Sequence, residues 1–234
     1  MARPLFAGAL FAGLAAGLIA ALLHFLLLAP LLLEGELYET GARVHFSAAG
    51  AGSPAGSPPL WADMGRQISS FAMIFVTYAG YALLLSAAMA VAVRSGRGVT
   101  LRSGMIWGLC GFIATALAPA VALPPELPGT VGAALASRQI WWLGAAGASA
   151  VGLGLIGLGR GSLPVVIGIL LLAAPHLIGA PRLDAYSGVA PPELASHYVT
   201  RVLGVSALAW TVMGAVAGWF WEQADQPGIR PTRQ

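Results

Sequence analysis

Long stretches of this sequence carry no charged residue, and this constrains the fold more than any other feature. Residues 4–33 and 68–93 contain no Asp, Glu, Lys or Arg. Each stretch exceeds the roughly 20 residues that a helix needs to cross the hydrocarbon core of a bilayer. The whole chain is 58% hydrophobic and 9% charged, whereas a soluble domain carries about a quarter charged residues. So little charge cannot cover a water-facing surface, which predicts an integral membrane protein.

Apolar runs bounded by charge, Gly or Pro predict an all-α bundle of about six transmembrane helices, with residues 1–234 forming one transmembrane domain. The expected helices are 4–30, 67–93, 104–123, 140–158, 163–181 and 199–221, joined by a flexible outer loop at 40–65 and followed by a short cytoplasmic tail at 222–234. Only residues 159–162 separate the fourth and fifth runs. The alternative for these two runs is a re-entrant pair, which gives five spans or fewer.

Several function classes are excluded by residues that the chain lacks. It has no lysine, so neither a P-loop lysine nor a Schiff-base lysine is available. Its single cysteine, Cys110, allows no intrachain disulfide and no cysteine cluster. The twelve arginines are scattered singly, so no nucleic-acid partner is expected. The spans contain no paired nucleophile and base, so we expect no enzymatic activity and no tightly bound cofactor.

The distribution of arginine predicts the orientation of the chain. With the N-terminus inside, seven of the arginines fall in the cytoplasm, as expected for short inner loops of a protein in the cytoplasmic (inner) membrane. Six spans then place both termini in the cytoplasm. Seven acidic residues fall outside: Glu34, Glu36, Glu39, Asp63, Glu126, Asp184 and Glu193. They form either a solvated outer face or a functional acidic rim.

Short motifs recur along the chain and suggest three helical-hairpin repeats. Ala-Pro occurs at 29–30, 118–119 and 174–175, and each copy is followed by acidic residues and a Pro-Pro pair. Pro-Pro-Glu-Leu occurs at both 124–127 and 191–194. Repeats of one orientation are related by an axis along the membrane normal, as in some transporters. Glycine pairs at four-residue spacing, such as Gly104 and Gly108, further predict closely packed helices.

Two histidines lie within apolar segments and are the strongest candidates for metal ligands. Imidazole suits Co, Ni, Zn and Cu, and carboxylates add charge and oxygen ligands. We therefore predict that His24 and His176 bind a cation together with Glu34 and Glu126. An outer acidic rim of Glu36, Asp184 and Glu193 would collect the ion. The alternative is that each histidine forms a hydrogen bond with a neighbouring helix.

Three sequence blocks resemble the CbtA family of proposed cobalt transporter subunits. They are RPLFAGALFAGLAAGLIAALLHFLLLAPLLLEGELYE near the N-terminus, PPELPG followed by RQIWW, and APHLIGAPR. The resemblance covers nearly the whole chain except the 48–60 linker and the C-terminal tail. The family pattern falls on His24, Glu34, Tyr38, Glu126, Arg138, Trp141 and His176. Our expected six spans depart from the roughly five that are common in descriptions of the family.

The resemblance implies a bilayer-embedded subunit that takes up cobalt, is linked to vitamin B12 metabolism and works with a small CbtB-like subunit. That partner is a single-span protein with a histidine-containing tail. Homo-oligomerisation stays open. Two alternatives also stay open: transport of another ion or of a cobalt-containing cofactor, and a non-conducting membrane scaffold or regulator of a metal-binding partner.

Overall fold

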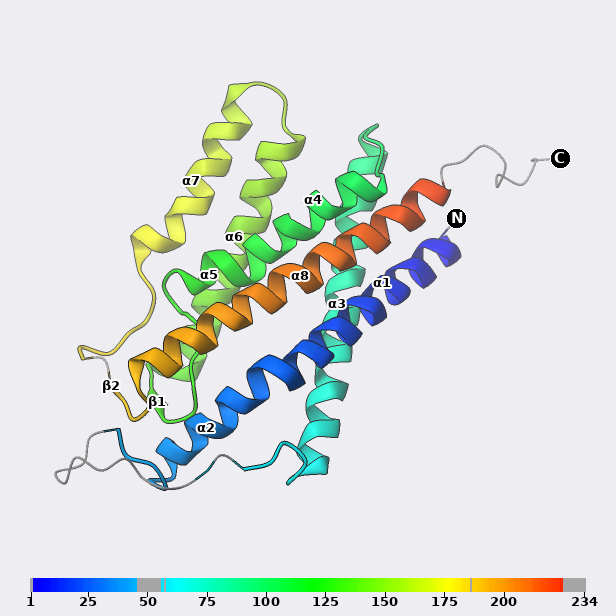
Figure 1. Cartoon of the computed structure of the whole chain (residues 1–234). Coiled ribbons are helices and arrows are strands. Elements are labelled where there is room, and N and C mark those ends of the chain that lie inside the picture. The colour runs from blue at the N-terminus through cyan, green and yellow to red at the C-terminus, as the bar shows by residue number, and fades with distance from the viewer. Residues whose placement is uncertain (1, 46–55, 57, 186, 225–234) are drawn as a thin grey trace. The chain divides into compact units, whose positions relative to one another are not determined.

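The structure is a computed structural model that describes residues 2–45, 56, 58–185 and 187–224, and helices dominate this part of the chain (Figure 1). The elements in chain order are α1 (Ala2–Leu23), η1 (His24–Leu28, a π-helix), α2 (Ala29–Glu39), α3 (Met64–Arg94), α4 (Leu101–Phe112), η2 (Ile113–Leu117, a π-helix), α5 (Ala118–Ala120), β1 (Thr130–Val131), α6 (Leu135–Leu158), α7 (Ser162–Ile178), β2 (Ser187–Gly188) and α8 (Pro192–Ala224).

The expected all-α membrane architecture is confirmed. Among the described residues, five helical stretches are long and apolar enough to cross a membrane: Leu5–Glu39, Met64–Arg94, Leu101–Ala120, Leu135–Leu158 and Pro192–Ala224. The sixth expected helix is present as α7, which has 17 residues. At 1.5 Å per residue α7 is about 26 Å long, slightly less than the roughly 30 Å of a hydrocarbon core.

Several helical runs are longer than the sequence predicted. The N-terminal run continues through η1 and α2 to Glu39, α6 begins at Leu135 rather than at residue 140, and α8 begins at Pro192 rather than at residue 199. Proline is well suited to a first helical turn, and Glu193 in that turn is favoured by the positive end of the helix dipole. Most of the predicted flexible loop centre, 46–55 and 57, lies outside the described residues, as does 225–234 of the predicted tail.

The chain divides into two compact units, and several helices contribute residues to both. Unit 1 consists of Met1–Leu22, Gly65–Phe112 and Ser206–Gln234, and unit 2 consists of Leu23–Met64 and Ile113–Val205.

In unit 1, glycines bring α1 against α3. A Cβ atom added to Gly13 would lie 2.7 Å from the Cα atom of Ala79, and one added to Gly17 would lie 2.9 Å from Cδ1 of Phe75. The contact partner moves back along α3 as α1 advances, so these two helices are antiparallel. Such close approach of helix backbones is a common way to stabilise helix pairs in lipid, where the hydrophobic effect gives no net attraction.

The α4–α8 pair in unit 1 packs backbone to backbone. A Cβ atom on Gly104 would collide with the carbonyl oxygen of Gly214, and one on Gly108 would collide with the carbonyl oxygen of Trp210. Gly218 in turn lies against Gly104 and the carbonyl of Thr100. The glycine pair that the sequence identified on α4, Gly104 and Gly108, therefore faces Gly214 and Gly218 of α8.

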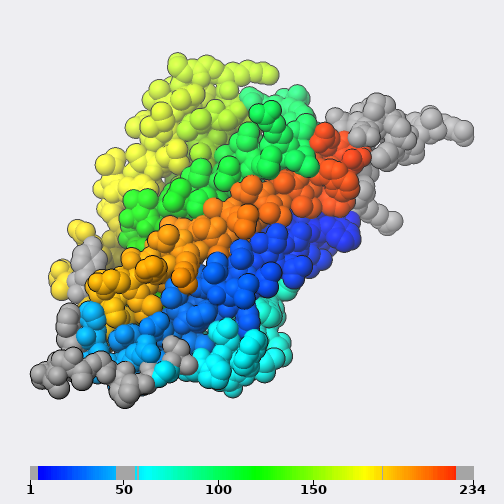
Figure 2. All heavy atoms as spheres, viewed as in Figure 1, coloured from blue at the N-terminus to red at the C-terminus, as the bar shows by residue number. Residues whose placement is uncertain are grey.

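The beginning of α1 and the end of α8 lie at the same end of unit 1. A Cβ atom on Gly8 would lie 2.7 Å from Cγ of Phe220, and Figure 2 shows α1 beside the last turns of α8. At this end Glu222 of α8 also accepts a hydrogen bond of 2.9 Å from the backbone N–H of Leu101, the first residue of α4. The segments of α1, α3, α4 and α8 in unit 1 therefore alternate in direction.

In unit 2, α6 and α7 form a helical hairpin. A Cβ atom on Gly152 would lie 2.7 Å from the carbonyl oxygen of Gly168, and the reverse distance is 2.6 Å. Gly161 has a φ of +84°, which permits the tight turn between the helices. Helix α6 also contacts η2 and α5.

The predicted repeats have a local counterpart in two of the three Ala-Pro motifs. A π-helix directly precedes Ala29-Pro30 and another directly precedes Ala118-Pro119. The third motif, Ala174-Pro175, lies within the regular helix α7. The arrangement of three hairpins about an axis along the membrane normal stays a prediction.

Candidate metal-binding site

Three segments that are distant in sequence meet at one end of unit 2, around the turn that contains Leu127. Leu127 is only 3% exposed. A Cβ atom on Gly35 of α2 would lie 3.3 Å from both Leu127 and Pro128. Gly129, with a φ of +77°, lies against Glu39 of α2 and Val189 beyond β2. The turn therefore connects the end of α2 to the segment that precedes α8.

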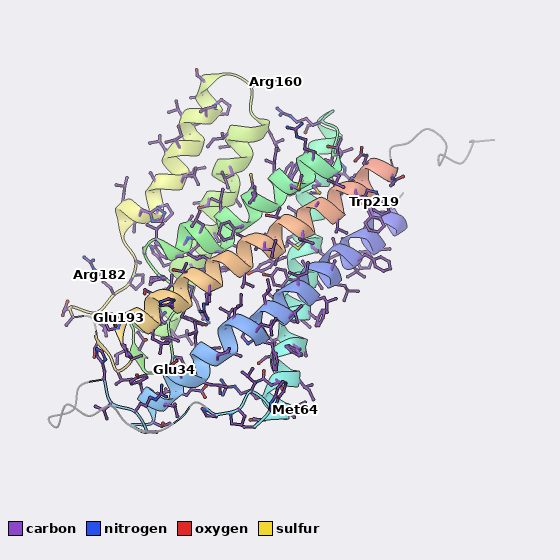
Figure 3. All side chains as sticks on the ribbon, viewed as in Figure 1. Glu34, Met64, Arg160, Arg182, Glu193 and Trp219 are labelled. Carbon is purple, nitrogen blue, oxygen red and sulfur yellow. The ribbon has the colours of Figure 1, made fainter. Side chains whose placement is uncertain are left out.

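A two-stranded antiparallel ladder strengthens this connection. Thr130 pairs with Gly188 and Val131 pairs with Ser187. Figure 3 shows Glu34 of α2 and Glu193 of α8 at this same end of unit 2. Segments that carry the predicted acidic residues are thus gathered at one end, as a shared rim requires.

The two Pro-Pro-Glu-Leu copies have different structures. Residues 124–127 form an irregular segment, whereas α8 begins within the second copy at Pro192. The residues that follow account for the difference. Pro128-Gly129 continues the first copy into a turn with positive φ, whereas Ala195 and Ser196 allow a helix to continue after the second.

Two of the predicted metal-binding carboxylates are paired with arginine. Glu34 accepts a hydrogen bond of 2.7 Å from Arg43, and Glu126 accepts one of 2.5 Å from Arg138. The Glu34 and Glu126 side chains are 33% and 29% exposed. Any cation that binds either carboxylate must therefore compete with a guanidinium group that already neutralises it.

The remaining rim residues differ in exposure. Asp184 and Glu193 are exposed, and Glu193 lies in the first turn of α8. Glu36 is half-buried and takes part in contacts of its own. Asp184 and Glu193 are therefore open to solvent ions, as a collecting rim requires.

His176 lies in the last turn of α7, and its ring contacts Trp141 of α6. The ring centroids are 6.2 Å apart and the ring planes are inclined by 69°. Among the described residues, neither Nδ1 of His176 nor Nε1 of Trp141 has a hydrogen-bond partner, although both atoms are buried. The negative end of the α7 dipole favours a cation at this position. His176 is therefore half-buried with a free ring nitrogen where positive charge is favoured.

His24 begins η1, where the helix widens. The backbone N–H of Ala29 donates to the carbonyl of His24, five residues earlier, instead of the usual four. Pro30 follows and has no N–H to donate. His24 is half-buried and makes contacts of its own. Inside helices, π-bulges are frequent at functional sites.

The structure does not gather the candidate ligands into one compact cluster. Within the described part of the chain, no group of three or more His, Cys, Asp and Glu side chains is arranged to hold a metal ion. The joint binding of one ion by His24 and His176 therefore stays a prediction. Arg43 and Arg201 are neighbours of the candidate site that the sequence did not identify, because their partners depend on the fold.

Comparisons with known proteins place the chain in one family. The family described as "Probable cobalt transporter subunit (CbtA)" matches residues 2–222. No curated protein and no solved structure matches the chain.

Proposed function

Because the chain belongs to the CbtA family of probable cobalt transporter subunits, we propose that it is the membrane-embedded subunit through which a cobalt uptake transporter binds its metal. With its long apolar helices it is a multi-pass membrane protein. The proposal locates it in the cytoplasmic membrane with both termini inside, together with a small single-span, histidine-containing partner. The word "subunit" in the family description supports a partner. In unit 1 the beginning of α1 lies beside the end of α8, which supports termini on the same side of the membrane.

The free ring nitrogen of His176 carries this proposal. A buried polar atom without a partner costs about 1–3 kcal/mol, and binding a metal ion at this nitrogen would remove that cost. A neutral imidazole nitrogen is a good ligand for cobalt(II). The end of α7 adds a favourable electrostatic field. These features support His176 as the inner ligand, with the Trp141 indole available to donate to a metal-bound water or carboxylate.

The other predicted residues take supporting roles in this proposal. His24 supplies a second imidazole, while Glu34 and Glu126 bind the ion after displacing Arg43 and Arg138. Glu36, Asp184 and Glu193 raise the local concentration of cations at the rim. Displacement of a guanidinium is feasible because each pair is partly exposed, and such pairs contribute only about 0–1 kcal/mol.

Uptake of radioactive cobalt(II) by cells that produce the full chain with its partner tests the proposal. We expect His176→Ala and His24→Ala each to lower uptake about tenfold or more, because losing even a supporting group of a metal site costs 10–100-fold in affinity. Residues acting as one unit are non-additive, so the double variant should be little worse. His197→Ala is the control, since His197 is exposed on α8.

Normal uptake by the double variant, at wild-type abundance, would remove both histidines from the mechanism. Purified chain in lipid vesicles, assayed with and without the partner, separates a conducting subunit from a scaffold. Uptake that requires only the partner would support the scaffold. Reporter tags at the two termini test the orientation, and tags that report opposite sides would contradict it.

A further inference from the structure

Arg201 connects α8 to the π-helix that begins at His24. It is the tenth residue of α8, well inside the helix, because α8 begins at Pro192. Its Nη1 atom donates a hydrogen bond of 3.1 Å to the backbone carbonyl of Leu27, 174 residues away in sequence. Leu27 belongs to η1. An arginine of one helix thus binds the main chain of another at an irregular point.

Backbone irregularity explains why η1 attracts an arginine. Pro30 has no N–H to donate, so the regular series of main-chain hydrogen bonds is interrupted around η1, where Leu27 lies. An unsatisfied carbonyl in apolar surroundings costs several kcal/mol. A guanidinium is a charged donor, and its hydrogen bonds are about twice as strong as neutral ones. Arg201 therefore stabilises η1 in its widened form.

The orientation of His24 depends on this widened turn. One extra residue in a turn rotates the side chains on either side relative to each other by about 100°. His24 is the first residue of η1, and its own carbonyl accepts the five-residue hydrogen bond from Ala29. If η1 returned to regular α-helix, the imidazole would point in a different direction relative to α2.

We propose that Arg201 is a positioning residue for metal binding: by holding the Leu27 carbonyl it fixes η1 and thereby the direction of the His24 imidazole. This inference rests on the proposed function, in which His24 is a metal ligand. Arg201 itself does not touch the metal.

The test uses purified full-length protein with cobalt(II) as the probe. The visible absorption spectrum of bound cobalt reports the ligand set directly, which a purely structural role of Arg201 would not change. We expect Arg201→Gln to accumulate like wild type, to bind cobalt about tenfold more weakly, and to show the same spectral change as His24→Gln. Arg201→Lys retains a cationic N–H donor and should recover part of the affinity. Arg182→Gln, a change of the same charge at an exposed loop position of unit 2, should alter nothing.

The double variant Arg201→Gln/His24→Gln tests whether the two residues affect cobalt binding through the same ligand. Its affinity should equal that of His24→Gln alone, because both changes disable one ligand. Additive losses would overturn the inference, as would a wild-type spectrum for Arg201→Gln. If Arg201→Gln fails to accumulate, Arg201→Lys and Arg201→Lys/His24→Gln carry the test. The double variant should then bind cobalt as His24→Gln does, and additive losses, or a wild-type affinity and spectrum for Arg201→Lys alone, would overturn the inference.

The experiments distinguish failure of the Arg201 positioning role from failure of the proposed function. A strong effect of His24→Gln on uptake, with no effect of Arg201→Gln, removes the positioning role and leaves the proposed function intact. A neutral His24→Gln variant removes His24 from the ligand set, and the role of Arg201 falls with it.

Discussion

Each of the two units of this chain is stabilised internally by a different set of interactions. In unit 1, glycine backbones of α4 and α8 contact each other directly, and α1 packs on α3 in the same manner. Unit 2 also contains such a contact, between Gly152 and Gly168. In addition, its described residues include the π-helices η1 and η2, the Glu34–Arg43 and Glu126–Arg138 ion pairs and a small β-ladder.

This difference suggests that unit 1 is the structural framework and that unit 2 contains the region for metal chemistry. Close backbone packing is well suited to lipid, because it needs no polar group and leaves no room for water. Ionisable groups, widened turns and unpaired polar atoms are costly to hold within a membrane protein and cluster at functional sites. The predicted ligands His24, His176, Glu34 and Glu126 all belong to unit 2. Unit 1 should therefore be sensitive to added volume, and unit 2 to altered chemistry.

The largest effect is expected from Gly108→Ala in unit 1. The new methyl group would collide with the carbonyl oxygen of Trp210, and neither backbone can move without displacing its helix. Overpacking of this kind costs about 1–3 kcal/mol. We expect a clear loss of accumulated protein and a lower thermal unfolding midpoint in detergent.

Gly80→Ala is the matched control, because it also lies in unit 1 and a Cβ atom there has nothing within 4 Å. It should leave both measurements unchanged. Equal tolerance of the two substitutions would break the distinction between the units, since it would mean that the α4–α8 contact is not rigid.

Part of this picture could be predicted from sequence. Uncharged runs longer than a bilayer crossing give the helices, and four-residue spacing identified Gly104 and Gly108 as contact positions. The different structures of the two Pro-Pro-Glu-Leu copies were not predicted, because the copies were interpreted as equivalent parts of a repeat. The turn signal Pro128-Gly129, which follows only the first copy, accounts for the difference.

The rest depends on contacts that no local pattern contains. Arg201 finds the Leu27 carbonyl across 174 residues, and nothing near Arg201 in sequence indicates this. The two Ala-Pro motifs that follow π-helices have a third copy within regular α7, so the dipeptide alone does not determine a bulge. The pairing of Trp141 with His176 depends on the α6–α7 packing.

The next largest effect should come from Pro30→Ala in unit 2. An alanine restores the missing N–H, which favours a regular α-helix in place of η1. Because η1 begins at His24, we expect cobalt uptake to fall several-fold, while protein abundance stays the same or rises. Pro119→Ala is the control, because η2 begins at Ile113 rather than at a histidine. Equal losses of uptake from both changes would mean that widened turns act through the fold and not through His24.

Ser149→Ala should change the stability of the protein less than Gly108→Ala does, and it should raise the unfolding midpoint instead of lowering it. The Ser149 side chain is fully buried in α6, and its hydroxyl has no hydrogen-bond partner among the described residues. Removing an unpaired buried hydroxyl should stabilise the protein by about 1 kcal/mol. A raised unfolding midpoint with unchanged uptake would support this. A lowered midpoint would show that the hydroxyl is satisfied, and unit 2 would then hold less polar strain than we infer.

The smallest effect concerns the Glu126–Arg138 pair. Its size shows whether this ion pair in unit 2 is weak and easily opened or strong and structural. Both side chains are about a quarter exposed, so a double-mutant cycle with Glu126→Gln and Arg138→Gln should give a coupling of about 0.2–1 kcal/mol that weakens with added salt. The Glu34–Arg43 pair offers a matched second cycle. Weak coupling in both fits carboxylates that release arginine when a cation arrives. A coupling of about 3 kcal/mol or more, insensitive to salt, would instead identify a desolvated structural clamp, and Glu126 would then belong with the framework and not with the metal site.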